Sequence, residues 1–71
     1  MEHLVSTIDS VRLSFLLALL RDAGIKADVF DANISALEAS IGAFPCRIMV
    51  PAKRLLAAKT LLEDANEFYN D

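Results

Sequence analysis

The stretch Ser35–Val50, SALEASIGAFPCRIMV, contains the last predicted strand of the chain and the connector that leads into it. Ser35 and Glu38 have the spacing of a capping box, in which two side chains satisfy backbone N–H groups at the start of a helix. Pro45 then precedes Cys46–Val50, a short apolar run typical of a strand. The connector is therefore predicted to be structured and to end in a strand that must join a sheet.

The residues before this stretch predict a strand, a helix and a second strand. Glu2–Thr7 is expected to form the first strand, after which Asp9 or Ser10 caps a helix through its side-chain oxygen. Gly24 supplies the left-handed residue that ends this helix. Ile25–Asp31 then alternates apolar and polar residues, which indicates a half-buried strand.

The last predicted element is a helix with Pro51 in its first turn, where a missing N–H costs nothing. It runs to about Asn66, with Tyr69 as its furthest extent. Because the first two strands enclose one helix, we expect them to be parallel, with the third strand between them. The sequence thus predicts a single α+β domain over residues 1–71, a ferredoxin-like split βαβ fold with βαββα order. Its three-stranded sheet has the order 1-3-2, both helices cover one face, and strand one is an open edge.

Composition limits the function classes. A chain of 71 residues buries only about 60% of its unfolded surface, yet 55% of its residues are hydrophobic. Some of the apolar surface is therefore expected to face a partner, and a homodimer is the simplest one. The net charge of −3 argues against nucleic acid and anionic membranes as partners. The first residues, Met1-Glu2-His3, lack the basic region of a signal peptide, so these residues are not expected to be one. The apolar run Phe15–Leu20 is far shorter than the roughly 20 residues that span a bilayer. A cytoplasmic protein is expected.

The alternation along the strands predicts a contact surface. One set of side chains would face the helices: Ile25, Ala27, Val29, Ile48 and Val50. Phe30, Arg47 and Met49 must then point to the opposite face of the sheet. Two large apolar side chains on an uncovered face indicate a covering element. That element is either the connector or another chain, and the sequence leaves both open.

The sequence predicts no enzyme, cofactor or metal site. Its only histidine, His3, lies beside the start of the chain, and no motif presents a serine nucleophile. Cys46, the only cysteine, is predicted to be a buried structural thiol in a strand. Two glycines cannot build a phosphate-binding loop, and His3 with Cys46 provides too few ligands for a metal ion.

The connector contains three further apolar residues, Leu37, Ile41 and Phe44. Its polar residues have ordinary roles in turns and caps. A short helix that presents Leu37 and Ile41 to a groove on a partner is the alternative.

Four motifs occur in order along the chain: Thr7-Ile8-Asp9, the segment LLRDAGI at 19–25, SALE at 35–38, and IGAFP at 41–45 before a hydrophobic strand. In this order they resemble a family of small prokaryotic domains of unknown function that carry the label of signal-transducing proteins. That family is considered similar in fold to nitrogen-regulatory signal-transduction proteins, which are ferredoxin-like oligomers that bind nucleotides and regulate partners. The resemblance to the family implies the βαββα fold and a role in signalling. The likeness to nitrogen-regulatory proteins supports the fold but does not carry their function across, because a fold alone does not define a function.

The predicted function is a non-catalytic regulatory or protein-interaction module in signal transduction, acting as a homodimer. The alternative is a small-ligand sensor for a metabolite or nucleotide. The residues predicted to contact a partner are Phe30, Met49, Arg47, Leu37, Ile41 and Phe44.

Overall fold

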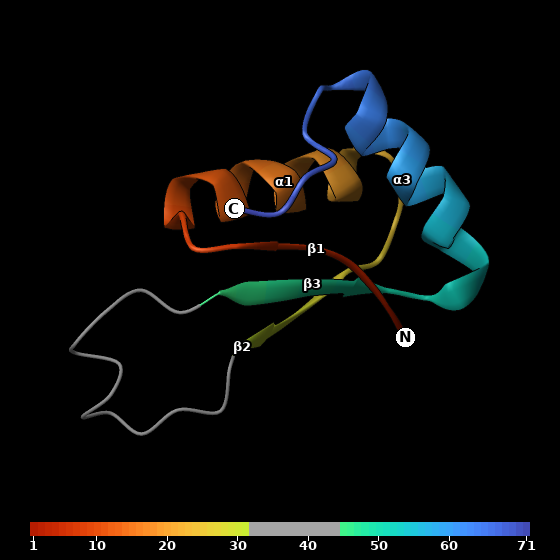
Figure 1. Ribbon diagram of the computed structural model, residues 1–71. Helices are drawn as coiled ribbons and strands as arrows, with labels where there is room; N and C mark the ends of the chain where they lie inside the picture. Colours follow the sequence, from red (N-terminus) through yellow and green to blue (C-terminus); the bar gives the residue numbers. More distant parts are fainter. Residues whose placement is uncertain (32–44) are drawn as a thin grey trace.

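The computed structural model describes residues 1–31 and 45–71, arranged as Figure 1 shows. Within these residues the elements are β1 (Glu2–Thr7), α1 (Ser10–Asp22), β2 (Asp28–Asp31), β3 (Cys46–Val50), the 3-10 turn η1 (Ala52–Arg54) and α3 (Leu55–Asp64). The strands form one sheet in the order β1-β3-β2, and β3 runs antiparallel to both neighbours. The outer strands are therefore parallel to each other. This topology confirms the predicted α+β fold with βαββα order.

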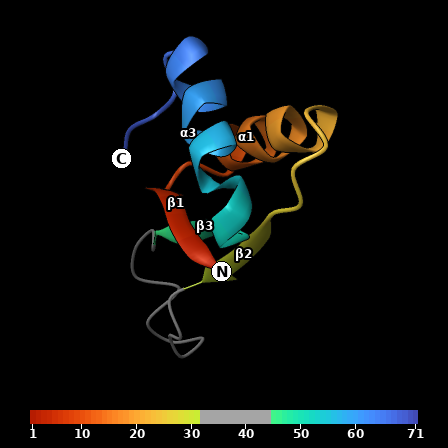
Figure 2. The ribbon, with the colours of Figure 1, turned by 90° about the vertical axis from the view of Figure 1, so that its right-hand side faces the viewer.

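Both helices lie on one face of the sheet, as Figures 1 and 2 show from two directions. Nonpolar side chains of both helices, of β1 and β3, and of the segment before β2 meet between the two layers. The fully buried side chains at the centre are Val5, Leu16, Leu20, Ile48, Val50, Ala58 and Leu62. A register shift in β1 between His3 and Val5 places the consecutive residues Leu4 and Val5 both in the core.

Helix α1 begins and ends as the sequence predicts. The Asp9 carboxylate accepts a hydrogen bond from the backbone N–H of Val11 at 2.9 Å. At the other end Gly24 has φ +74°, its N–H donates to the carbonyl of Arg21, and the N–H of Ile25 donates to the carbonyl of Leu20. This pair of bonds is a Schellman motif, which satisfies the last carbonyls of the helix.

The second strand is shorter than predicted. It spans Asp28–Asp31, whereas the alternation predicted a strand from Ile25. The reason is local, because the N–H of Ile25 already closes the end of α1. Pairing with β3 begins only where Asp28 lies opposite Met49.

The last helix is also shorter than predicted. It begins at Leu55 after the turn η1, so that Pro51 precedes the helical residues instead of lying in their first turn. It ends at Asp64, because Asn66 adopts a left-handed conformation with φ 59°. The N–H groups of Asn66 and Glu67 then donate to the carbonyls of Glu63 and Leu62, which forms a second Schellman motif.

This second motif reverses the direction of the chain. The residues after it run back toward the start of α1 and the edge of β1, where Figure 1 places the C-terminus. A helix continued to Tyr69 would have carried the same residues away from the sheet. The early end of α3 therefore positions the C-terminal tail, residues 67–71.

Candidate functional site

Arg12, in the first turn of α1, is buried although it is charged. Its Nε donates to Glu67 Oε1 at 2.9 Å, and its Nη1 donates to Asp71 Oδ1 at 3.1 Å. Its Nη2 donates to the backbone carbonyls of Glu67 at 2.7 Å and Tyr69 at 2.8 Å. The Tyr69 ring centroid lies 3.9 Å from Arg12 Cζ, within range of a cation–π contact. We call Arg12, Glu67, Tyr69 and Asp71 the tail clasp.

The tail clasp holds the tail against the edge of β1. The N–H of Ser6 donates to Asn70 Oδ1 at 2.7 Å, and the carbonyl of Ser6 accepts from the N–H of Asp71 at 3.2 Å. The outward backbone groups of Ser6 are thus occupied within the chain. The sequence predicted an open edge here; that prediction is wrong at Ser6, because the tail turns back to cover it.

The charges of the clasp favour one another. A hydrogen bond from the Thr7 hydroxyl lowers the pKa of Asp71 below its ordinary value, and the attraction and hydrogen bond of Arg12 lower it further, although desolvation opposes both. Burial lowers the pKa of Arg12, but its hydrogen bond to Glu67 and the attraction of Tyr69, Asp71 and Glu67 outweigh burial and raise it. Both shifts favour the charged pair, so the clasp is an ionic contact that acid would weaken.

The sheet face opposite the helices carries three of the predicted contact residues. In the central row, Arg47 of β3 lies opposite Ser6 of β1 and Phe30 of β2. Directly opposed residues point to the same face, and Ile48, the next residue of β3, is fully buried in the core. The central row therefore points away from the helices. Phe30 is 45% exposed on this face, and Arg47 is exposed beside it.

The neighbouring row of this face is centred on Met49, which is half-buried and lies opposite His3 and Asp28. His3 Nε2 and Ser6 Oγ share a hydrogen bond at 2.8 Å. The face thus combines apolar groups with the carboxylate of Asp28, the guanidinium of Arg47 and the imidazole of His3. We call the following residues the open face: His3, Ser6, Asp28, Phe30, Arg47 and Met49.

The other predicted contact residues lie outside the described part of the chain. These are Leu37, Ile41 and Phe44, together with the capping box of Ser35 and Glu38. Their roles stay predictions.

The structure also locates the two residues considered as metal ligands. His3 lies on the open face, and Cys46 is half-buried opposite Thr7, so the predicted full burial of this thiol is wrong. Across residues 1–31 and 45–71, no group of three or more His, Cys, Asp and Glu side chains could hold a metal ion. Among the helices in the same ranges, none combines the length and the hydropathy needed to cross a membrane.

Residues 1–66 match the model of a protein family described as "Putative prokaryotic signal transducing protein". The chain belongs to this family. The match spans every element described above, from β1 through α3, and it confirms the resemblance drawn from the four motifs. The description of the family assigns its members to signal transduction. No curated protein and no solved structure matches the chain.

Sequence reasoning missed the tail clasp. Arg12 could have been noticed as the one charged residue between Ser10 and Leu20 in a predicted amphipathic helix. An acid-rich and aromatic tail, with Glu67, Tyr69 and Asp71, was the second signal. The two signals could not be connected from the sequence, because the connection depends on where α3 ends.

Proposed function

We propose that this chain is a non-catalytic interaction module in signal transduction and that it works as a homodimer joined through its open face. The observation that carries this proposal is the exposure of Phe30 beside Met49 on the sheet face opposite both helices. Burying such side chains against a partner contributes about 1.5–3 kcal/mol for each one that becomes fully buried. The surface is thus suited to association.

The sheet edges are less suitable than the face. The tail occupies the outward backbone groups of β1 at Ser6. The strand at the other edge, β2, is four residues long and begins at the acidic residue Asp28. Like charges repel when such a strand approaches a second copy of itself, which is a common way of blocking an edge.

A second copy of the chain is the partner that the charges favour. The open face carries both a base, Arg47, and an acid, Asp28. In a two-fold interface the same surface patch of each copy faces the other. If Arg47 of one copy contacts Asp28 of the second, then Asp28 of the first copy contacts Arg47 of the second. Arg47 of each copy would meet Asp28 of the other, with Phe30 and Met49 between these pairs.

Sedimentation velocity tests the proposal. The chain should sediment as a dimer, and Phe30→Ser with Met49→Ser should weaken the dimer by at least about tenfold for each side chain removed from the interface. The matched control is Leu56→Ser, since Leu56 is 78% exposed on α3, away from the open face. A monomeric native chain, or equal weakening by the control, would contradict the proposal.

Charge reversal gives a sharper test of the arrangement. Arg47→Asp and Asp28→Arg should each weaken the dimer, because each brings like charges together across the two-fold axis. The two changes combined should restore association, since the charges are then exchanged. Single reversals that leave the dimer unchanged would exclude this pairing, and circular dichroism would verify that each variant is folded.

A further inference from the structure

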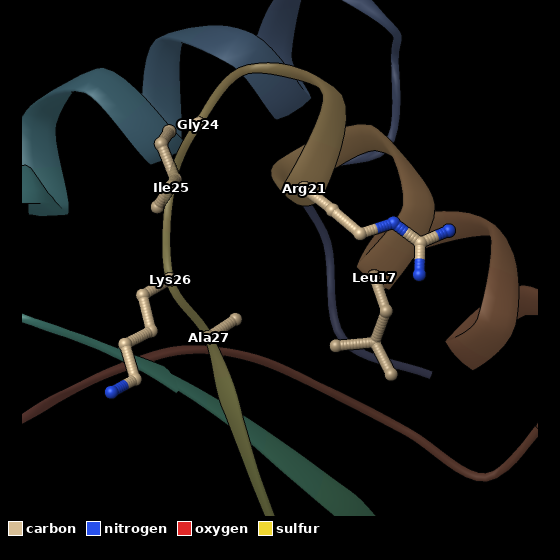
Figure 3. A pocket seen from close by; sticks show the side chains of 6 residues that line it. All are labelled: Leu17, Arg21, Gly24, Ile25, Lys26 and Ala27. Carbon is tan, nitrogen blue, oxygen red and sulfur yellow. The ribbon is translucent and has the colours of Figure 1, made fainter.

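The last turn of α1 and the segment after it border an open hollow of about 410 Å³, shown in Figure 3. Its volume is within the range of roughly 300–1,000 Å³ that is usual for small-molecule sites. The hollow lies at the end of α1 opposite the tail clasp and does not include any residue of the open face. Its lining residues are Leu17, Arg21, Gly24, Ile25, Lys26 and Ala27.

The lining combines apolar walls with two cations. Leu17 and Ala27 are half-buried, and Ile25 is buried. Arg21 projects from α1, whereas Lys26 projects from the other side of the segment that leads into β2, so the cations flank the apolar part in Figure 3. A mostly apolar hollow with a few charged groups at its rim is the usual composition of a ligand site.

Neither of these two cations forms an ion pair with a residue that the structure describes. Within residues 1–31 and 45–71 the ion pairs are those of Arg12 with Glu67 and Asp71, and neither Arg21 nor Lys26 takes part in one. Arg21 in a last helical turn also interacts favourably with the helix dipole, but Lys26 follows the helix and has no such role.

The backbone around the hollow is fixed before any ligand arrives. The Schellman motif at Gly24 and Ile25 ties the segment to the last turn of α1. A ligand that enters a preformed site does not have to order the chain, which reduces the cost of binding.

We propose that this hollow binds a small organic anion. The apolar part of the ligand lies against Leu17 and Ala27, and its carboxylate or phosphate group is bound by the guanidinium of Arg21. The ammonium group of Lys26 lies on the other side of the segment and contributes only the attraction of its charge. A planar guanidinium can donate two parallel hydrogen bonds to either anionic group. The inference is independent of the dimer, because the hollow and the open face share no residue.

An NMR titration of the full-length chain with hexanoate tests the proposal, with hexyl phosphate as the second anion and hexanamide as the neutral control. Either anion should shift the amide signals of residues 17–27 in a saturable way. The tighter of the two identifies the anionic group. Hexanamide should bind at least about tenfold more weakly, because it lacks the charge that strengthens the hydrogen bonds.

Variants then separate the site from general electrostatic attraction. Arg21→Gln with Lys26→Gln should weaken the better anion by at least about tenfold. Lys53→Gln removes an exposed cation of η1 and should leave the affinity unchanged. The proposal is overturned if neither anion causes saturable shifts at residues 17–27, if hexanamide binds equally well, or if Lys53→Gln weakens binding as much as the double variant does. None of these results would alter the outcome of the sedimentation experiment.

Discussion

The two ends of helix α1 each carry an arginine, and the fold treats them in opposite ways. At the first turn, the Arg12 side chain is only 7% exposed and is bound by carboxylates, carbonyls and a ring from the tail. At the last turn, Arg21 is exposed beside an apolar hollow and forms no ion pair with the described residues. The same residue type therefore closes one end of the helix and leaves the other available to a ligand.

The difference arises from the range of the contacts. Asp9 caps the N–H groups of the first turn, but the side chain of Arg12 in that turn is bound by residues more than fifty positions away, since Arg12 and Glu67 are separated by 55 positions. The last turn is closed within its own segment, by the hydrogen bonds around Gly24. Both ends are thus capped by local residues, and the two arginines differ because the C-terminal tail reaches Arg12, whereas no described residue forms an ion pair with Arg21.

The largest expected difference comes from replacing each arginine, in separate variants, with methionine, a nonpolar residue of similar length. Arg12→Met should destabilise the chain by about 2–4 kcal/mol, because the Glu67 and Asp71 side chains, 23% and 34% exposed, lose their buried partner. Arg21→Met should change stability by no more than about 0.5 kcal/mol. Urea denaturation of both variants measures the difference.

Arg12→Lys is the matched control for this comparison. It keeps the charge but loses the fork that reaches Glu67, Asp71 and two carbonyls together, so an intermediate loss is expected. Equal stability of the Met variants at the two positions would show that the tail clasp contributes nothing to folding.

The sequence was sufficient to predict the elements whose signals are local. The Asp9 cap, the Gly24 termination and the β1 limits Glu2–Thr7 were all correct, because each depends on a few neighbouring residues. The strand order followed as well, since a helix between two strands leaves few topologies.

The tail clasp could not be predicted in the same way. Leu61, Leu62 and Ala65 continue the helical period of α3, and Asn66 gives only a weak stop signal compared with glycine. The left-handed conformation of Asn66 decides where the tail goes, and hence what surrounds Arg12. For the open face the problem is different. Alternation correctly predicted which way Phe30 and Met49 point, but a pattern does not say whether another chain covers them.

A smaller effect should follow from changing the local closure of the last turn. Gly24→Ala should cost about 1–2 kcal/mol, because its φ of +74° disfavours a Cβ-bearing residue. A Cβ added there meets no atom within 4 Å, so packing adds nothing to this cost. Thermal unfolding measures the loss.

Asn66→Gly provides the opposite control, since glycine relieves the left-handed conformation at the end of α3 and should leave stability unchanged or slightly raised. If Gly24→Ala proved neutral, the left-handed conformation at position 24 would carry no cost for a residue with a Cβ, and glycine would not be required to end α1.

The smallest expected effect is the loss of stability in acid that comes from Asp71, the carboxylate that binds Arg12 in the first turn of α1. The folded pKa of Asp71 lies below its ordinary value of 3.8, so its contribution to stability is complete above that value and disappears as the pH falls through the folded pKa. Asp71→Asn should remove this contribution at neutral pH and flatten the loss of stability below about pH 4. The last turn of α1 has no comparable carboxylate pair in the described chain, so Arg21→Gln should leave the pH dependence unchanged. Urea unfolding midpoints, recorded across this pH range, compare the native chain with Asp71→Asn and Arg21→Gln. If Asp71→Asn loses stability in acid as steeply as the native chain does, the clasp holds through Glu67 and the tail carbonyls rather than through Asp71.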